Sequence, residues 1–222
     1  MNGYGFDLVG ARLVALPSGA LHWPEERCLA VSDLHLGRSE RYARRAGALL
    51  PPYEVGDTLA RLDADIAATR ARTVICLGDS FDDLDAGALP EPAALWLTRL
   101  MAGRRWIWIE GNHDPGPVAT GGEHRADLTL GRLTFRHEAR AGAAGEVSGH
   151  YHPKVTLAGR GIRCFLVDGA RVILPAYGTY TGGLKADDPA FCALMGPGAL
   201  AILTGQVARP MPMPMPRGRN GK

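Results

Sequence analysis

The sequence predicts an α/β protein, and three observations lead to this class. Short apolar segments alternate with amphipathic ones in the first half of the chain, which is typical of a sheet flanked by helices. Several of the apolar segments end in loops carrying Asp, His or Asn. The second half is divided by turn signals into short segments, which favours hairpins.

The first half contains strands and helices in turn. The predicted strands are residues 6–16, 28–32, 73–77 and 105–109, and the predicted helices are residues 38–48, 55–69 and 92–101. Leu59, Leu62 and Ile66 follow the i, i+3, i+7 spacing of an amphipathic helix. Pro51 and Pro52 end the first helix, because proline cannot continue one.

The second half has a different character. Residues 128–136 are interrupted by a Gly-Arg pair, residues 164–174 by Asp168-Gly169, and residues 199–207 form a last predicted strand. Residues 1–208 are therefore predicted to be a single domain. The Pro/Met-rich basic tail, residues 209–222, is predicted to be extended or disordered because it cannot bury a core.

Composition excludes several classes of protein. A chain of 222 residues with 46% hydrophobic and 22% charged residues is typical of a soluble globular domain. It has neither an apolar stretch of about 18 residues nor a signal peptide at its start, so a cytoplasmic protein is expected. The four cysteines lack CxxC spacing and are predicted to be buried in a reducing compartment. A net charge of +2 is too small to indicate nucleic acid by itself.

Five loops that follow apolar segments carry the chemistry. They read SDLHLG, GDSFD, EGNHD, RHE and SGHYHP, and they contain five of the seven histidines. Because ligands gather beyond the carboxyl ends of strands in open α/β sheets, these side chains are expected to meet at one edge. The candidate metal-site residues are Asp33, His35, Asp79, Asn112, His113, His137, His150 and His152.

The residue types indicate which metal and which reaction. Imidazole, carboxylate and amide groups without thiolate suit Mn, Fe, Co, Ni or Zn in five- or six-coordinate sites. Eight such groups are too many for one ion. Two ions about 3.5–4 Å apart would clamp the attacking and leaving oxygens of a displacement at phosphorus. The sequence therefore predicts phosphoester hydrolysis.

The five loops match signature blocks in order: DxH, GD, GNHD, H and GHxH. In this the chain resembles the calcineurin-like metallophosphoesterase superfamily. Further strings, among them RRAGALLPPYEVGDTLARL and LPAYGTYTGGL, are similar to its branch of ligase-associated DNA damage response endonucleases. The resemblance implies two mixed β-sheets packed face to face and flanked by helices, a four-layer αββα sandwich. It also implies a manganese-dependent phosphodiesterase and DNA endonuclease in DNA repair, encoded beside a DNA ligase, a helicase and an exonuclease.

The resemblance also implies how the residues share the work. The expected ligands are Asp33, His35 and His152 for the first ion, Asn112, His137 and His150 for the second, and Asp79 as the bridge. A hydroxide between the ions is the expected nucleophile, since metal binding lowers the pKa of water. His113 is expected to face the scissile phosphate, with Asp114 holding its other ring nitrogen.

Other interpretations stay open. A small-molecule phosphoesterase acting on nucleotides, cyclic phosphodiesters or phosphomonoesters is the main alternative, and a scaffold without activity is disfavoured because no ligand is missing. Arg38, Arg41 and Arg45 lie on one face of the predicted helix at 38–48, either binding DNA or forming a solvated surface. His22 and His124 are expected at the surface. Asp82, Asp83, Tyr151 and residues 179–183 receive no assigned role.

Overall fold

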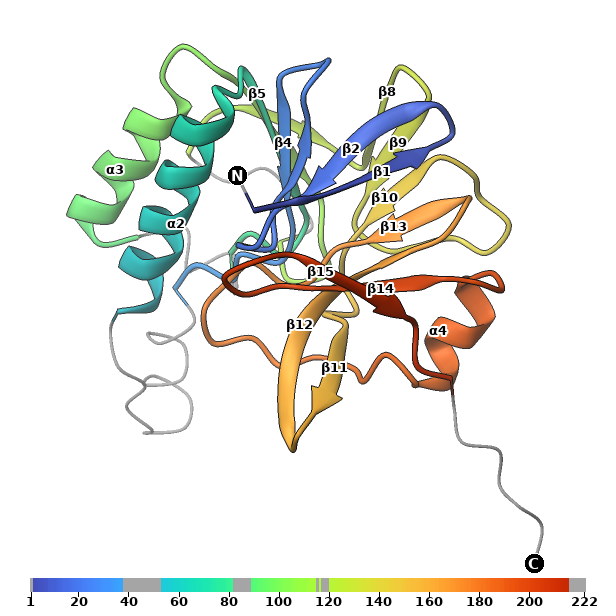
Figure 1. Cartoon of the computed structure of the whole chain (residues 1–222). Coiled ribbons are helices and arrows are strands. Elements are labelled where there is room, and N and C mark those ends of the chain that lie inside the picture. The colour runs from blue at the N-terminus through green and yellow to red at the C-terminus, as the bar shows by residue number, and fades with distance from the viewer. Residues whose placement is uncertain (1, 38–52, 82–88, 115, 117–119, 216–222) are drawn as a thin grey trace, which may run out of the picture.

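The computed structural model describes residues 2–37, 53–81, 89–114, 116 and 120–215. Its elements are arranged in layers (Figure 1). The elements are β1 (Tyr4–Leu8), β2 (Ala11–Ala15), β3 (Leu21–Trp23), β4 (Cys28–Val31), α2 (Glu54–Thr69), β5 (Thr73–Leu77), α3 (Glu91–Met101), β6 (Arg105–Ile109), β7 (Glu123–Arg125), β8 (Asp127–Leu130), β9 (Leu133–Arg136), β10 (Glu146–Ser148), β11 (Lys154–Leu157), β12 (Arg160–Val167), β13 (Arg171–Ile173), α4 (Pro189–Leu194), β14 (Leu200–Leu203) and β15 (Arg209–Pro212).

Two mixed sheets form the centre of the protein. The first has the order β1-β2-β3-β4-β5-β6-β7, and the second has the order β15-β14-β12-β13-β10-β9-β8 with β11 paired to β12. In the first sheet β4, β5, β6 and β7 run parallel. In the second, β10 runs parallel to both β9 and β13. The carboxyl ends of β4, β5 and β6 therefore share one edge, as do those of β9 and β10.

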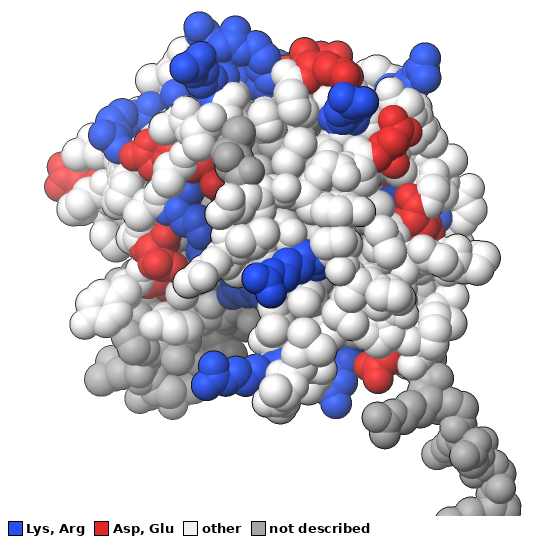
Figure 2. Space-filling model, viewed as in Figure 1, with Lys and Arg blue, Asp and Glu red and all other residues white. Residues whose placement is uncertain are grey.

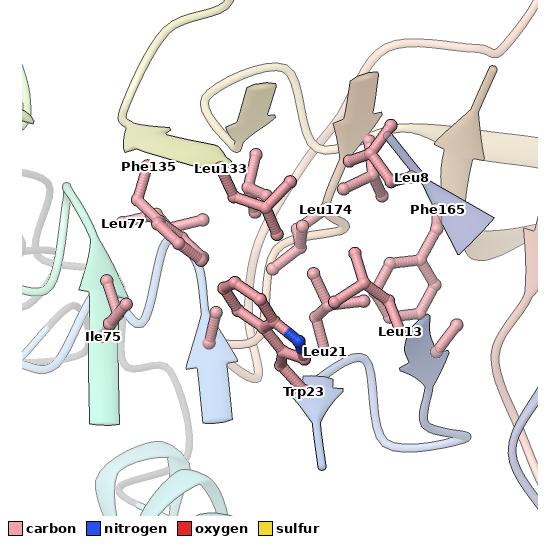
Figure 3. Packing of buried hydrophobic residues seen from close by; sticks show 14 of the residues in the cluster. Leu8, Leu13, Leu21, Trp23, Ile75, Leu77, Leu133, Phe135, Phe165 and Leu174 are labelled. Atoms are coloured by element: carbon pink, nitrogen blue, oxygen red, sulfur yellow. The ribbon is translucent and has the colours of Figure 1, made fainter. Parts of the chain in front are cut away.

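Three apolar clusters separate the layers. Leu21, Ile75, Phe135 and Phe165 belong to the cluster between the two sheets (Figure 3). A second cluster joins α2 and α3 to the outer face of the first sheet. A third joins Phe191 of α4 to the outer face of the second sheet. This layering confirms the predicted four-layer αββα sandwich.

Residues 6–16 were predicted as one strand, and they form the hairpin of β1 and β2 instead. Val9 and Gly10 turn the chain with φ values of 46° and 83°, and the Asp7 carboxylate accepts the Gly10 N–H at 2.9 Å. Two consecutive positive φ values are the requirement of a tight hairpin turn. The sequence predicts this turn poorly, because only the glycine of the Val-Gly pair is typical of such turns and valine rarely has a positive φ.

The prediction for the tail is wrong at its start, because Arg209–Pro212 form β15 and pair with β14. The alternation of Pro and Met has the period of a strand, which places Met211 and Met213 against the cluster beneath α4. Proline is tolerated because β15 is the last strand of its sheet. The domain therefore continues beyond residue 208, and residues 216–222 lie outside the described part of the chain.

A buried ion-pair network fixes β9, β10 and β13 relative to one another. Glu146 of β10 and Arg171 of β13 are register partners, and their side chains are 1% and 3% exposed. The Arg171 guanidinium donates to Glu146 at 3.1 Å and to the carbonyl oxygens of Arg140 and Ala143. Arg136 of β9 donates to the other Glu146 oxygen at 3.3 Å. Arg136 directly precedes His137, and Glu146 begins the strand whose end leads to His150.

Glu146→Ala is expected to lower the free energy of unfolding by about 3–5 kcal/mol, because Arg171 would keep a buried charge without its partner. Glu123→Ala is the matched control: Glu123 pairs with Arg105, whose side chain is 43% exposed, and such a pair is worth less than about 1 kcal/mol. Urea unfolding followed by circular dichroism measures both changes. Equal losses in the two variants would contradict this account of Glu146.

Candidate metal centre

The structure brings the five predicted loops together at the edge where the parallel strands end. Asp33, Asp79 and Asn112 follow β4, β5 and β6 of the first sheet. His137 follows β9 and His150 follows β10 of the second sheet. The site is thus built from both sheets, at the line where their edges meet.

Six of the candidate ligands fall into two groups. Asp33, His35 and His152 each offer one ligand atom, and these atoms lie within 4.8 Å of one another. Asp79, His137 and His150 form a second group within the same limit. The Asn112 Oδ1 atom joins the second group, at 2.9 Å from His137 Nε2 and 3.1 Å from His150 Nδ1.

The second group presents several acceptor atoms to one point. His137 Nδ1 donates its proton to the carbonyl oxygen of Leu77 at 2.9 Å, so Nε2 carries a lone pair. That lone pair faces Asn112 Oδ1 at 2.9 Å and Asp79 Oδ2 at 3.5 Å. Acceptors that converge in this way repel one another unless a cation lies between them. The donor set therefore fits a metal ion.

The first group contains buried polar atoms whose hydrogen-bonding capacity is unused. Asp33 Oδ1 and His152 Nε2 lie 3.1 Å apart, and neither makes a hydrogen bond to the described part of the chain. A buried polar atom left in this state costs about 1–3 kcal/mol. A bound cation would satisfy both atoms, so this group also fits a metal ion.

The pKa shifts favour the ligating forms of the side chains. Burial acts to raise the pKa of Asp33, but the His152 and His137 rings and the Ser32 hydroxyl outweigh burial and lower it. Asp33 is therefore ionised. Burial and the neighbouring His137 lower the pKa of His150, so its imidazole is neutral near pH 7. Ionised carboxylate and neutral imidazole are the forms that bind metal.

The backbone is strained where it turns towards the site. Nine non-glycine residues in the described ranges have positive φ, and five of them are candidate ligands. These are Asp33 (53°), His35 (46°), Asp79 (46°), His150 (70°) and His152 (49°). Such outliers cluster at functional sites because the surrounding structure must hold them in place.

Asp114 holds the loop after β5 through both of its carboxylate oxygens. One carboxylate oxygen accepts the N–H groups of Asp79 and Gly111 at 2.9 and 3.1 Å. The other accepts those of Ser80 and Phe81 at 2.8 and 3.2 Å. Four donors use the acceptor capacity of a carboxylate. Burial nevertheless raises the pKa of Asp114 to about 6.

Two glycines allow the loops to approach closely. A Cβ atom at Gly111 would collide with the backbone nitrogen and the carboxylate of Asp79. A Cβ atom at Gly149 would collide with the Ser32 hydroxyl, which also donates to Asp33. Glycine is therefore required at both positions for a steric reason.

Residues 177–183, which include the segment 179–183 that the sequence left without a role, brace the first group. The N–H of Gly178 donates to the carbonyl oxygen of Asp33 at 3.0 Å. The half-buried Arg163 guanidinium donates to the carbonyl oxygens of Gly178 and Thr179 at 2.6 and 2.8 Å. Burial and the charge of Arg61 lower the pKa of Arg163 to about 10. Residues distant in sequence make these contacts, so no local pattern could reveal them.

An open cavity of about 220 Å³ exposes the site to solvent. Its lining residues are His35, Asp79, Asn112, His113, His150, His152 and Gly182. His113 lines the cavity without belonging to either group of three, and its ring centroid lies 5.3 Å from that of His35. Tyr151 instead packs edge-on against His150 and Phe191 and donates to Glu138 at 3.3 Å.

Arg38, Arg41, Arg45, Asp82 and Asp83 lie outside the described residues.

The expectation that His22 lies at the surface is wrong. It is 6% exposed, because β3 is an internal strand and pairs His22 with Val14 and Leu29. His124 is half-buried on β7. Cys28, Cys76 and Cys164 are buried as predicted.

The fold and the two groups define a metal-dependent phosphoesterase. Residues 26–179 match the model of the calcineurin-like phosphoesterase family, and the chain belongs to that family. The crystal structure of Pseudomonas putida nuclease MPE is similar over 95% of this chain and 100% of that chain, with 28% identity and a TM-score of 0.76. No match was found among curated proteins. No helix among the described residues is long and apolar enough to cross a membrane.

Gly111→Ala is expected to weaken the binding of divalent metal at least tenfold, because the added methyl group displaces Asp79. Gly56→Ala is the control, since a Cβ atom there meets nothing within 4 Å. That change should leave metal binding intact and stabilise α2 by about 0.5–1 kcal/mol. Calorimetric titration of the chelated proteins with Mn²⁺ measures binding. Unchanged binding by the Gly111 variant would show that the loop can shift without cost.

Proposed function

We propose that this protein is a two-metal phosphodiesterase that cuts DNA. The observation that carries the proposal is the pair of three-residue groups at one sheet edge, each drawing side chains from both sheets. Asp33, His35 and His152 would hold the first ion. Asn112, His137 and His150 would hold the second. Asp79 belongs to the second group and also lines the cavity, which suits it to contact both ions.

The donor set favours a transition metal, with manganese our first choice. Four imidazoles, two carboxylates and one amide oxygen suit borderline ions better than Mg²⁺, which prefers oxygen ligands and water. When bound, a pair of such ions neutralises charge on the phosphate and lowers the pKa of water. The protein's part is to hold the seven donors at fixed positions before the substrate arrives.

His113 is suited to a different task from the ligands. It lines the cavity outside both groups, so its ring can meet a phosphodiester that enters there. Its backbone N–H donates to Asp79 Oδ1 at 2.8 Å, which fixes its position relative to the second group. We assign it the protonation of the leaving oxygen.

The comparison with a solved nuclease supports nucleic acid as the substrate, because that similarity extends over nearly all of both chains. A role in DNA repair, together with a ligase, a helicase and an exonuclease, follows from the resemblance of the sequence to the repair branch. A shared gene neighbourhood would support that role. The small-molecule alternative predicts activity on nucleotides or phosphomonoesters and none on plasmid DNA.

Chelated protein should be inactive on plasmid DNA and on bis-p-nitrophenyl phosphate. Mn²⁺ should restore both activities best and Mg²⁺ poorly. Asp79→Ala should lower kcat by about 10²-fold or more, since it removes charge stabilisation at the phosphate. Asp63→Ala, at a carboxylate that pairs with Arg99 on the helices, should have little effect. Full activity after exhaustive chelation would disprove the two-metal proposal.

His113→Ala should affect DNA more than bis-p-nitrophenyl phosphate. A general acid matters most for a poor leaving group such as the alkoxide of DNA, whereas a nitrophenolate departs unaided. The variant should bind Mn²⁺ with unchanged affinity, and His124→Ala on β7 should behave like the wild type. Equal losses of kcat on both substrates would assign His113 an electrostatic role instead.

A further inference from the structure

A second cavity, of about 470 Å³, lies at the opposite end of the parallel strands. Four of its lining residues are arginines, namely Arg27, Arg70, Arg72 and Arg104, and the rest are Ile, Ala and Gly. Lys and Arg side chains gather on this part of the surface, at the top of the view over the end of α2 and the start of β5 (Figure 2). The whole chain carries only +2.

The strand register sets three of these arginines in a row. Arg27, Arg72 and Arg104 immediately precede Cys28, Thr73 and Arg105, which are register partners on β4, β5 and β6. Neighbouring strands lie about 4.8 Å apart. Backbone bonds fix the row, because the N–H groups of Arg72 and Arg105 donate to the carbonyl oxygens of Arg27 and Arg72 at 2.8 and 2.9 Å. Backbone hydrogen bonds therefore fix the positions from which these arginine side chains extend.

No carboxylate pairs with these four arginines in the described part of the chain. By contrast, Arg99 and Arg105 nearby pair with Asp63 and Glu123. Part of their role is local: Arg104 donates to the carbonyl oxygens of Leu100 and Ala102 at the end of α3, and Arg27 to that of Arg70. Each helix end contributes about −0.5 charge. Two helix ends leave most of four positive charges uncompensated.

From this cavity we infer a second binding site, which takes phosphate groups of the nucleic-acid backbone at a distance from the cut bond. Guanidinium groups match phosphate oxygens in geometry. An acidic protein partner is a poorer fit, because the rest of the lining offers no exposed aromatic anchor of the kind that protein interfaces use. The inference rests on the proposed function for its choice of ligand. It predicts that long substrates bind more tightly than short ones.

The test compares two triple variants that each change the net charge from +2 to −1. The cavity variant, Arg27, Arg70 and Arg72→Gln, removes three of the four cavity arginines and keeps Arg104, which caps α3. Arg12, Arg160 and Arg209→Gln removes three exposed arginines from β2, β12 and β15. Binding of a fluorescent oligodeoxynucleotide to chelated protein is measured from low to moderate salt. Cleavage of long DNA and of bis-p-nitrophenyl phosphate is measured with Mn²⁺.

The cavity variant should bind DNA at least tenfold more weakly than the control variant, and its plot of log affinity against log salt should be flatter by about 0.7 per lost contact to single-stranded DNA. KM for long DNA should rise with kcat unchanged, and hydrolysis of the small diester should not change. Equal affinities and slopes in the two variants would overturn the inference and leave an acidic protein as the ligand to seek. DNA binding that depends on the cavity arginines, without any DNA cleavage, would overturn the proposed function alone.

Discussion

The contact between the two sheets is the constraint on which the metal centre depends. Each group of candidate ligands takes members from both sheets: Asp33 and Asp79 follow strands of the first sheet, and His137 and His150 follow strands of the second. The lone pairs of these groups repel one another without a cation, so their approach must be maintained by other forces. Burial of apolar surface in the cluster between the sheets supplies that force, at about 25 cal/mol per Å². A change in the spacing of the sheets would separate the two halves of both groups.

The loops impose a further cost, because five candidate ligand residues adopt left-handed backbone conformations. At about 1–2 kcal/mol each, these conformations together cost about 5–10 kcal/mol, which is comparable with the whole stability of a domain. Asp and His tolerate this region better than most residues, so the lower end applies. The four hydrogen bonds from backbone N–H groups to the Asp114 carboxylate offset this strain, as do the contacts of residues 177–183. A bound metal would add stabilisation through linkage, since it binds only the folded arrangement.

The sequence could predict which side chains meet at the sheet edge, because each one lies in a loop that follows an apolar strand, so its place was a local property. The helices predicted at 55–69 and 92–101 also followed from local patterns. The function of Asp114 could not be predicted, since its acceptors serve the amides of a loop 33 to 35 residues earlier. Arg163 reaches its partners only after β12 has paired within the second sheet. The alternation of Pro and Met has the period of two that indicates a strand, as β15 confirms. The prediction of a disordered tail instead followed from the high proline content.

Parallel strands give a protein two chemically different ends, and this chain uses the difference. Loops leaving the carboxyl ends of β4, β5 and β6 carry the candidate ligands. The amino ends receive the carboxyl termini of α2 and α3, whose partial negative charge favours arginine. The same dipoles that stabilise each arginine singly thus gather several of them on one surface. Net charge hides this separation, since a chain of +2 can hold an acceptor-rich edge and a strongly basic one at opposite ends of a single sheet.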